Sequence, residues 1–280
     1  MQFRMLCRCV CVLVAVIFAL GATASAVDLT KDEIEFRKKV LVNKKGERLQ
    51  YRLYVPVTYS KERKYPLVLW LHGGEGRGSD NVRQITKGNE KGSHFWTSQE
   101  NQLKFTAFVL APQCPVDDNW ADPDLNEPSK ALLLTMEALE AVEREFSIDL
   151  DRVYIAGQSM GGLGVYALQQ KYPEKWAAAI VISAYDNFSN AGAITRIPLW
   201  VFQGDADQTV PVNLVREMMR RLRKLHANAR YTEYHKADHD VWNRAFAEPD
   251  LLPWLSSQTR GQARPAVQGQ VGSTAPPANH

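Results

Sequence analysis

The feature that constrains this chain most is a strand-to-helix turn centred on Ser159. Residues 153–156 are apolar or β-branched, as in a short buried strand, and residues 163–172 have the pattern of a helix. Gly157 and Gly161 flank the serine, and their missing side chains permit a sharp reversal between the two elements. Such a turn holds the serine hydroxyl above the sheet edge, near the positive end of the helix. The pattern therefore predicts either a nucleophilic serine or a tight turn with a capping serine.

Strands and helices are predicted to alternate along the rest of the chain. Apolar or alternating runs predict strands, and the expected strands are residues 34–43, 48–55, 66–71, 105–112, 152–157, 177–183, 198–202 and 229–234. Apolar residues at three- and four-residue spacing predict helices, which are expected at residues 128–146, 163–172 and 212–226. The first two strands are expected to form an antiparallel pair at the sheet edge. The alternation predicts an α/β fold with a mostly parallel eight-stranded sheet and helices on both faces.

The N-terminus has the features of a secretory signal. Arg4 and Arg8 precede an apolar run over residues 10–20 that is short for a bilayer, and residues 24–26 form a small-x-small cleavage site. We therefore expect residues 1–26 to be a signal peptide, with an uncleaved anchor as the alternative. Cleavage would give a secreted or periplasmic protein with no stable membrane partner.

The remaining composition is that of one ordinary globular domain. The chain has 280 residues, of which 45% are apolar and 23% are charged. Its net charge is +3, and it contains no long run of basic residues. Nucleic acid is therefore not an expected partner. The expected divisions are a catalytic domain over residues 27–255 and a disordered tail over residues 256–280, where large apolar residues are rare.

Four chemically notable loops each follow an expected strand. They are the His-Gly-Gly turn at residues 72–74, the Ser159 turn, the acidic loop at residues 205–207 and the histidines at residues 235–239. Because the carboxyl ends of parallel strands meet at one edge of the sheet, we expect these loops to lie together. The chain order of serine, acid and histidine is that of an α/β-hydrolase.

Each group of such a site has a chemical requirement. Ser159 needs a base to take its proton, a histidine titrates in the right range, and a carboxylate orients that histidine. We expect His239 to be the base, because it lies in the loop beyond the strand, whereas His235 is at the strand end. Asp207 is expected to be the acid, because Asp205 directly follows a glycine and is better placed to turn the chain. The weaker alternatives for the acid are Asp238 and Asp240, which are too close to His239 in sequence.

An oxyanion hole and a substrate cleft are expected beside this group. The N–H groups of Met160 and Gly74 are the predicted oxyanion donors, with Glu75 as the alternative to Gly74. Residues 75–100 are polar and rich in glycine, and they predict a loop or partial lid in which Asp80 caps a short helix. The residues expected to contact substrate are Trp96, Trp120 and Gln158.

No metal or organic cofactor is expected. The loop after residue 112 carries several aspartates, but it lacks the order and the distal glutamate of a calcium loop, so a solvated acidic loop is the better interpretation. Cys114 follows an expected strand and is interpreted as a small buried residue.

Several segments together resemble a known group of enzymes. They are residues 51–56, 65–74, 110–115, 157–162, 204–211 and 239–242. They resemble secreted α/β-hydrolases of the predicted-peptidase and carboxylesterase group, which are relatives of dienelactone hydrolases, polyhydroxybutyrate depolymerase-like esterases and feruloyl esterases. In that family the aspartate of Gly-x-x-Asp-x-x-Val-Pro is the triad acid, which here is Asp207. The family's histidine before Asp/Ser-x-Trp matches His239. Residues 74–76 read Gly-Glu-Gly where relatives more often have Ala-Gly-Glu.

The resemblance implies a serine carboxylesterase that acts through an acyl-enzyme on a small or polymer-linked ester. Acetyl or feruloyl esters of polysaccharide are a hypothesis for the substrate. One alternative is a serine peptidase of the prolyl-oligopeptidase type, which shares the triad but usually has a further domain. The other is a non-catalytic binding protein on the same fold, which would usually lack a triad residue.

Overall fold

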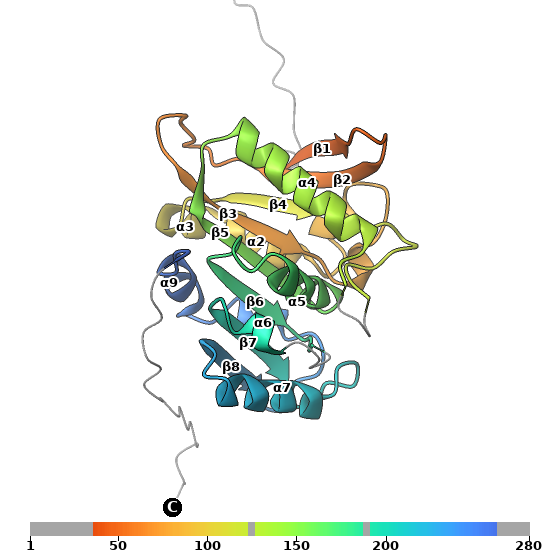
Figure 1. The fold of residues 1–280 in the computed structure, drawn as a ribbon, viewed down its shortest axis with the longest axis vertical. Coiled ribbons are helices and arrows are strands. Elements are labelled where there is room, and N and C mark those ends of the chain that lie inside the picture. Colours follow the sequence, from red (N-terminus) through yellow and green to blue (C-terminus); the bar gives the residue numbers. More distant parts are fainter. Residues whose placement is uncertain (1–35, 123–126, 187–190, 262–280) are drawn as a thin grey trace, which may run out of the picture.

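The computed structural model describes residues 36–122, 127–186 and 191–261. Its eight strands form one sheet in the order β1-β2-β4-β3-β5-β6-β7-β8 (Figure 1). The strands are β1 (Arg37–Val42), β2 (Arg48–Tyr54), β3 (Tyr65–Leu71), β4 (Phe108–Pro112), β5 (Ile148–Gln158), β6 (Ala178–Ile182), β7 (Leu199–Gly204) and β8 (Ala229–Tyr234). The expected α/β fold with eight strands is confirmed.

The sheet is parallel from β4 to β8 and antiparallel at its other edge. β1 pairs with β2, and β2 pairs with β4, in antiparallel register. β3, β4, β6 and β7 are buried along their whole length, because helices cover both faces. The parallel pairing brings the carboxyl ends of β3, β5, β7 and β8 to the same edge of the sheet.

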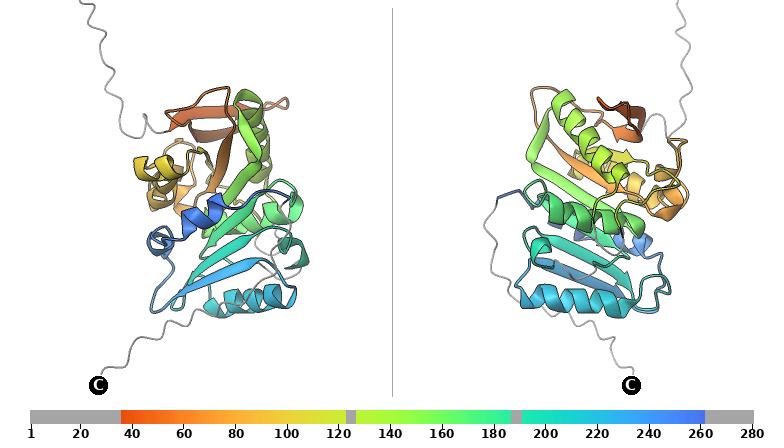
Figure 2. Two further views of the ribbon diagram at one scale, coloured as in Figure 1. Left: turned by 90° about the vertical axis from the view of Figure 1, so that its left-hand side faces the viewer. Right: turned by 45° about the vertical axis from the view of Figure 1, so that its right-hand side comes forward.

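Helices lie on both faces of the sheet, as expected from the alternation. They are α2 (Glu90–Thr97), α3 (Gln99–Lys104), α4 (Lys130–Glu145), α5 (Met160–Lys171), α6 (Ala191–Ile194), α7 (Val212–Lys224), α8 (Trp242–Ala245) and α9 (Leu251–Ser256). The left view of Figure 2 shows α2, α3, α8 and α9 on one side, with α4, α5 and α7 on the other. Two apolar cores fill the spaces between each helical layer and the sheet.

The segment after β3 is more regular than the sequence indicated. In place of an irregular loop, residues 75–100 contain two short 3₁₀ turns, η1 (Gly74–Gly76) and η2 (Arg83–Ile85), followed by α2. The Asp80 carboxylate accepts from the N–H groups of Val82 and Arg83, at 2.8 and 3.1 Å, and so forms a turn that leads into η2, whose N-cap residue is Val82. The lid interpretation is therefore wrong for α2, which packs on the sheet instead.

The structure describes only a small part of the two expected chain ends. The expected signal peptide lies outside the described residues, as does most of the expected tail. Residues 256–261, however, belong to the fold, because Arg260 donates its backbone N–H and its guanidinium to Asp151, each at 2.8 Å. Within the described residues, no helix has the length and apolar character needed to cross a membrane.

Candidate active site

Ser159 occupies the strained turn between β5 and α5. Its φ of 51° and ψ of −121° lie outside the regions that non-glycine residues favour. The turn is held by its N–H, which donates to the Ile182 carbonyl at 2.8 Å. It also needs Gly161, because a Cβ there would lie 2.0 Å from the carbonyl oxygen of Leu71. The glycine lets α5 begin directly against the end of β3, so the serine is fixed at the sheet edge.

The His239 imidazole bridges Ser159 and Asp207. Its Nε2 lies 2.8 Å from Ser159 Oγ, and its Nδ1 lies 2.9 Å from Asp207 Oδ2. Because a carboxylate only accepts, Nδ1 carries the proton and Nε2 is left to accept from the serine hydroxyl. The Asp207 side chain is fully buried, and that of His239 is 19% exposed. This arrangement can remove a proton from Ser159 and stabilise the imidazolium that results.

The Asp207 carboxylate is held by four hydrogen bonds. Oδ1 accepts from the N–H groups of Thr209 and Val210, each at 2.8 Å. Oδ2 accepts from Gln203 Nε2 at 2.8 Å, besides its contact with His239. The buried charge is therefore fully partnered and points at the imidazole.

The competing acid and base pair with each other and not with the serine. His235 Nδ1 lies 2.8 Å from Asp205 Oδ2, and the His235 side chain is 79% exposed. Asp238 accepts from the N–H groups of Gln208 and His239 and so shapes the loop. The structure thus separates the two Asp–His pairs, and only the pair of His239 reaches Ser159.

A second serine, which the sequence did not single out, holds the histidine loop. Ser183 follows β6, is fully buried and has a φ of 54°. Its hydroxyl donates to the backbone carbonyl of His239 at 2.7 Å. Gly204 supports the same loop, because a Cβ there would lie 2.3 Å from the Ala237 carbonyl oxygen.

The expected oxyanion donors lie in neighbouring turns. Met160 is the first residue of α5, where N–H groups have no partner within the helix. Gly74 and Glu75 begin η1, whose first hydrogen bond runs from the Gly76 N–H to the Gly73 carbonyl. Gly74 and Glu75 therefore both remain candidates for the second donor.

A buried histidine fixes the turn that carries these donors. Burial lowers the pKa of His72 from 6.5 to about 4, so the ring is neutral at physiological pH. Its Nε2 accepts from the Cys114 N–H at 3.0 Å, which leaves Nδ1 to donate to the Gly73 carbonyl at 2.7 Å. His72 thereby links β3, the glycine turn and the end of β4.

The three residues expected to contact substrate are instead buried. Trp96 is 2% exposed and packs edge-on against Phe246. Trp120 is fully buried and donates its indole N–H to the His72 carbonyl at 3.0 Å. Gln158 is 2% exposed, and its amide donates to the Gly88 carbonyl at 3.0 Å. These side chains support the loops around the site, because their surfaces are covered by protein.

The acidic loop shows structural roles where its residues are described. Asp118 accepts from the Ala131 N–H at 3.1 Å, at the start of α4. The described residues contain no group of three or more His, Cys, Asp or Glu side chains that could hold a metal ion. Cys114 is fully buried, and burial raises the pKa of its thiol to about 12.

The sheet order and the strand–turn–helix geometry at Ser159 define an α/β-hydrolase fold. More particularly, the chain belongs to the Esterase family, described as "Putative esterase", whose family model matches residues 43–246. The resemblance inferred from the sequence motifs is thereby confirmed at the level of the esterase group.

Individual relatives agree with this family. The chain is 28% identical over 134 residues to "Probable feruloyl esterase C" of Aspergillus terreus, over 48% of this chain and 46% of that protein. It is 34% identical to the crystal structure of a thermostable esterase, with a TM-score of 0.77, over 81% of this chain and 64% of the other. The chain therefore spans less than two thirds of the length of either relative. The chain shares its fold with the ferulic acid esterase of Anaeromyces mucronatus. The two are 17% identical, with a TM-score of 0.57 over 82% of this chain and 93% of the other.

Proposed function

We propose that this protein is a serine carboxylesterase in which Ser159 is the nucleophile, His239 the general base and acid, and Asp207 its orienting carboxylate. The observation that supports this most directly is the continuous hydrogen-bonded chain from Ser159 Oγ through His239 to the buried Asp207. The esterases among its relatives support the same reaction class.

The proposed reaction has two half-reactions. In the first, His239 Nε2 takes the proton of Ser159 as Oγ attacks the ester carbonyl, and it then gives that proton to the departing alcohol. In the second, His239 takes a proton from water, the hydroxide attacks the acyl-enzyme, and Ser159 recovers its proton as the acid leaves. The N–H of Met160 and that of Gly74 or Glu75 would stabilise the oxyanion formed in each step.

The substrate and the location are also part of the proposal. The name of the Aspergillus terreus relative supports a feruloyl ester. We assign the alcohol part to a polysaccharide, and acetyl esters of polysaccharide are the second candidate. The signal-like N-terminus, with Arg4 and Arg8 before an apolar run, supports action outside the cytoplasm.

The test is hydrolysis of p-nitrophenyl acetate by the wild type and by Ser159→Ala. We expect the variant to lose about 10³-fold or more in kcat. Ser256→Ala, an exposed serine in α9, is the matched control and is expected to retain full activity. Full activity in Ser159→Ala would contradict the assignment of the nucleophile.

Two further measurements separate the alternatives. A peptidase would cleave N-acetylated peptide amides in addition to the matched esters, whereas an esterase would cleave the esters and leave the amides intact. A fluorophosphonate that labels Ser159 in the wild type distinguishes an enzyme from a binding protein, since labelling requires an activated serine.

A further inference from the structure

The backbone N–H groups of the turn at residues 73–78 fall into two sets. In the first set each N–H donates to a protein acceptor, at distances between 2.7 and 3.3 Å; its members are Gly73, Gly76, Arg77 and Gly78. In the second set, the N–H groups of Gly74 and Glu75 have no acceptor among the residues that the structure describes. These two are therefore the donors that the turn leaves for a substrate.

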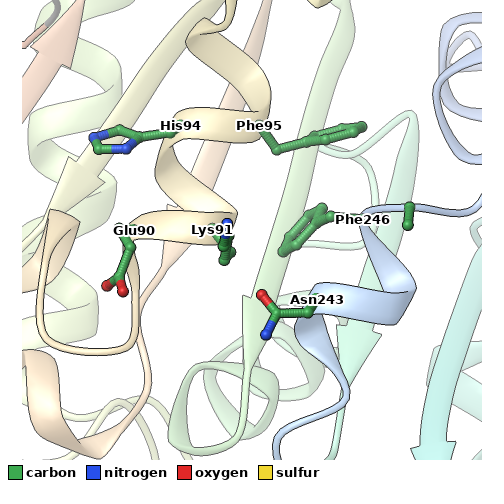
Figure 3. Close-up of a pocket in the computed structure, with 7 residues that line it drawn as sticks. Glu90, Lys91, His94, Phe95, Asn243 and Phe246 are labelled. Carbon is green, nitrogen blue, oxygen red and sulfur yellow. The ribbon is translucent and has the colours of Figure 1, made fainter.

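The start of this turn is anchored to α2. Asn89, which directly precedes α2, accepts from the Gly73 N–H through its side-chain Oδ1 at 2.7 Å. The helix is itself held in place, because its Phe95 ring packs against Phe246 of α8. The two ring centroids are 4.9 Å apart, beside a pocket of about 300 Å³ (Figure 3). Since the start of the turn is fixed, a change in its shape would be the rotation of a peptide within it.

The Gly74 carbonyl, which shares a peptide with the Glu75 N–H, is held by Arg77. Arg77 donates to this oxygen twice, from its side-chain Nε at 3.2 Å and from its backbone N–H at 3.3 Å. Arg77 Nη1 also donates to Asn119 Oδ1 at 3.4 Å, whereas no carboxylate of the described residues forms an ion pair with Arg77. The guanidinium is therefore directed at the turn and not at an acidic side chain.

The peptide between Gly74 and Glu75 has two orientations that a turn can adopt. The Gly76 N–H donates to the Gly73 carbonyl, and neither Gly74 nor Glu75 has a positive φ, as in a type I turn. Rotating the central peptide would give a type II turn, which needs a positive φ at Glu75. That conformation costs free energy at a residue with a side chain. Glu75 thus opposes the rotation, and the hydrogen bonds of Arg77 oppose it further.

Rotation of this peptide would damage the proposed oxyanion hole. The Glu75 N–H would turn away, and the Gly74 carbonyl oxygen would take its place beside the Gly74 N–H. An oxygen there would repel the negative oxygen of the tetrahedral intermediate, whichever of the two residues is the second donor. Rotation would also break both hydrogen bonds from Arg77, and the one from Nε is of the stronger kind because its donor is charged.

We propose that Arg77 is a positioning residue of the oxyanion hole, which holds the peptide between Gly74 and Glu75 in the orientation that keeps both N–H groups available. The proposal rests on the esterase function above and adds to it a residue outside the triad. Arg77 acts through the backbone of the turn and does not contact the substrate. Its removal should therefore slow the chemical steps and leave substrate binding almost unchanged.

The kinetic test compares Arg77→Ala and Arg77→Lys with the wild type on p-nitrophenyl acetate, a neutral ester. We expect Arg77→Ala to lose about tenfold in kcat with less than about a threefold change in KM, because the lost contact acts on the oxyanion. Arg77→Lys keeps a charged donor and should recover part of kcat. Arg223→Ala removes an exposed arginine near the last residue of α7, with the same change in net charge, and should retain full activity.

A second substitution tests the rotation itself. Glu75→Gly removes the cost of a positive φ at this position, so only Arg77 then opposes the rotated turn. The loss of kcat in the double variant Glu75→Gly/Arg77→Ala should therefore exceed the product of the two single losses by about threefold or more. A loss equal to that product would overturn the proposed action of Arg77 on this peptide.

Labelling of Ser159 by a fluorophosphonate separates this proposal from the esterase function. The reaction places a phosphoryl oxygen in the oxyanion hole, so Arg77→Ala should be labelled about tenfold more slowly than the wild type, whichever ester the enzyme prefers. A wild type that is labelled but hydrolyses no ester would overturn the esterase function, and the labelling rates would then decide on Arg77. A wild type that is neither active nor labelled would overturn both.

The role of Arg77 alone is overturned if Arg77→Ala is labelled at the wild-type rate. It is also overturned if the variant slows only an ester that carries a carboxylate, such as mono-p-nitrophenyl succinate, because Arg77 would then bind substrate. Arg77→Met keeps most of the side-chain volume without the donors, and it replaces Arg77→Ala in every comparison if thermal unfolding shows that Arg77→Ala does not fold.

Discussion

The Ser183 hydroxyl donates a 2.7 Å hydrogen bond to the backbone carbonyl of His239, which joins the end of β6 to the loop that carries the proposed base. Ser183 makes this contact from a left-handed conformation with a φ of 54°. Non-glycine residues reach such conformations at a cost of about 1–2 kcal/mol. A backbone conformation of this cost, fully buried beside the site, indicates a positioning residue.

Removing the Ser183 hydroxyl should therefore lower kcat. We expect about a tenfold loss in Ser183→Ala, with little change in KM and slower labelling of Ser159 by a fluorophosphonate. Ser183→Gly separates the bond from the backbone strain, because glycine adopts a positive φ freely. Ser183→Gly should lose as much kcat as Ser183→Ala, but it should unfold at a higher temperature than Ser183→Ala. Wild-type kcat in both variants would show that the hydroxyl has no positioning role.

The two Asp–His pairs provide a matched comparison for the triad carboxylate. Asp207→Asn should reduce kcat about 10³- to 10⁴-fold, because an amide cannot keep the proton on Nδ1 and stabilise the imidazolium. Asp205→Asn alters the exposed pair with His235 and should change kcat less than about threefold. Steady-state kinetics on one ester measures both variants, and equal losses would contradict the choice of Asp207.

His72 should make stability depend on pH in a defined window. Burial lowers its folded-state pKa from 6.5 to about 4. As the pH falls from 6.5 to 4, the unfolded chain binds a proton at His72 that the folded protein excludes, so the free energy of unfolding falls. The loss from this one group is about 3 kcal/mol once the pH is below 4. Urea unfolding at several pH values gives the free energy of unfolding as a function of pH. This free energy should fall less steeply with pH in His72→Gln than in the wild type, and an identical dependence would contradict His72 as the cause.

Close packing at the serine turn should make Gly161 intolerant of a side chain. A Cβ at this position would lie 2.0 Å from the Leu71 carbonyl oxygen, which belongs to backbone that cannot move aside. We expect Gly161→Ala to lower the free energy of unfolding by about 3 kcal/mol or more. We also expect this variant to lose the fluorophosphonate labelling of Ser159. Gly192→Ala is the control, because a Cβ there meets nothing within 4 Å, and thermal unfolding should show it to be neutral or slightly stabilised.

Much of the fold follows from local sequence patterns. The apolar run at residues 66–71 corresponds to β3, and the three- and four-residue spacing at residues 128–146 corresponds to α4. Apolar periodicity did not predict the helix within residues 75–100. This helix, α2, is short, contains a glycine and buries few large apolar residues. Such a helix gains its stability from packing on the sheet, which periodicity does not report.

The sequence by itself determined which loops share the active edge, because strand order and parallel pairing decide where loop residues such as Ser159 and Asp207 lie. Tertiary structure alone decided what each side chain touches. Trp96 and Trp120 look like cleft residues in sequence, yet both are buried. Ser183 is unremarkable in sequence, yet it contacts a residue 56 positions away. Contacts of that kind depend on how packed elements approach one another, whereas local patterns specify only the elements.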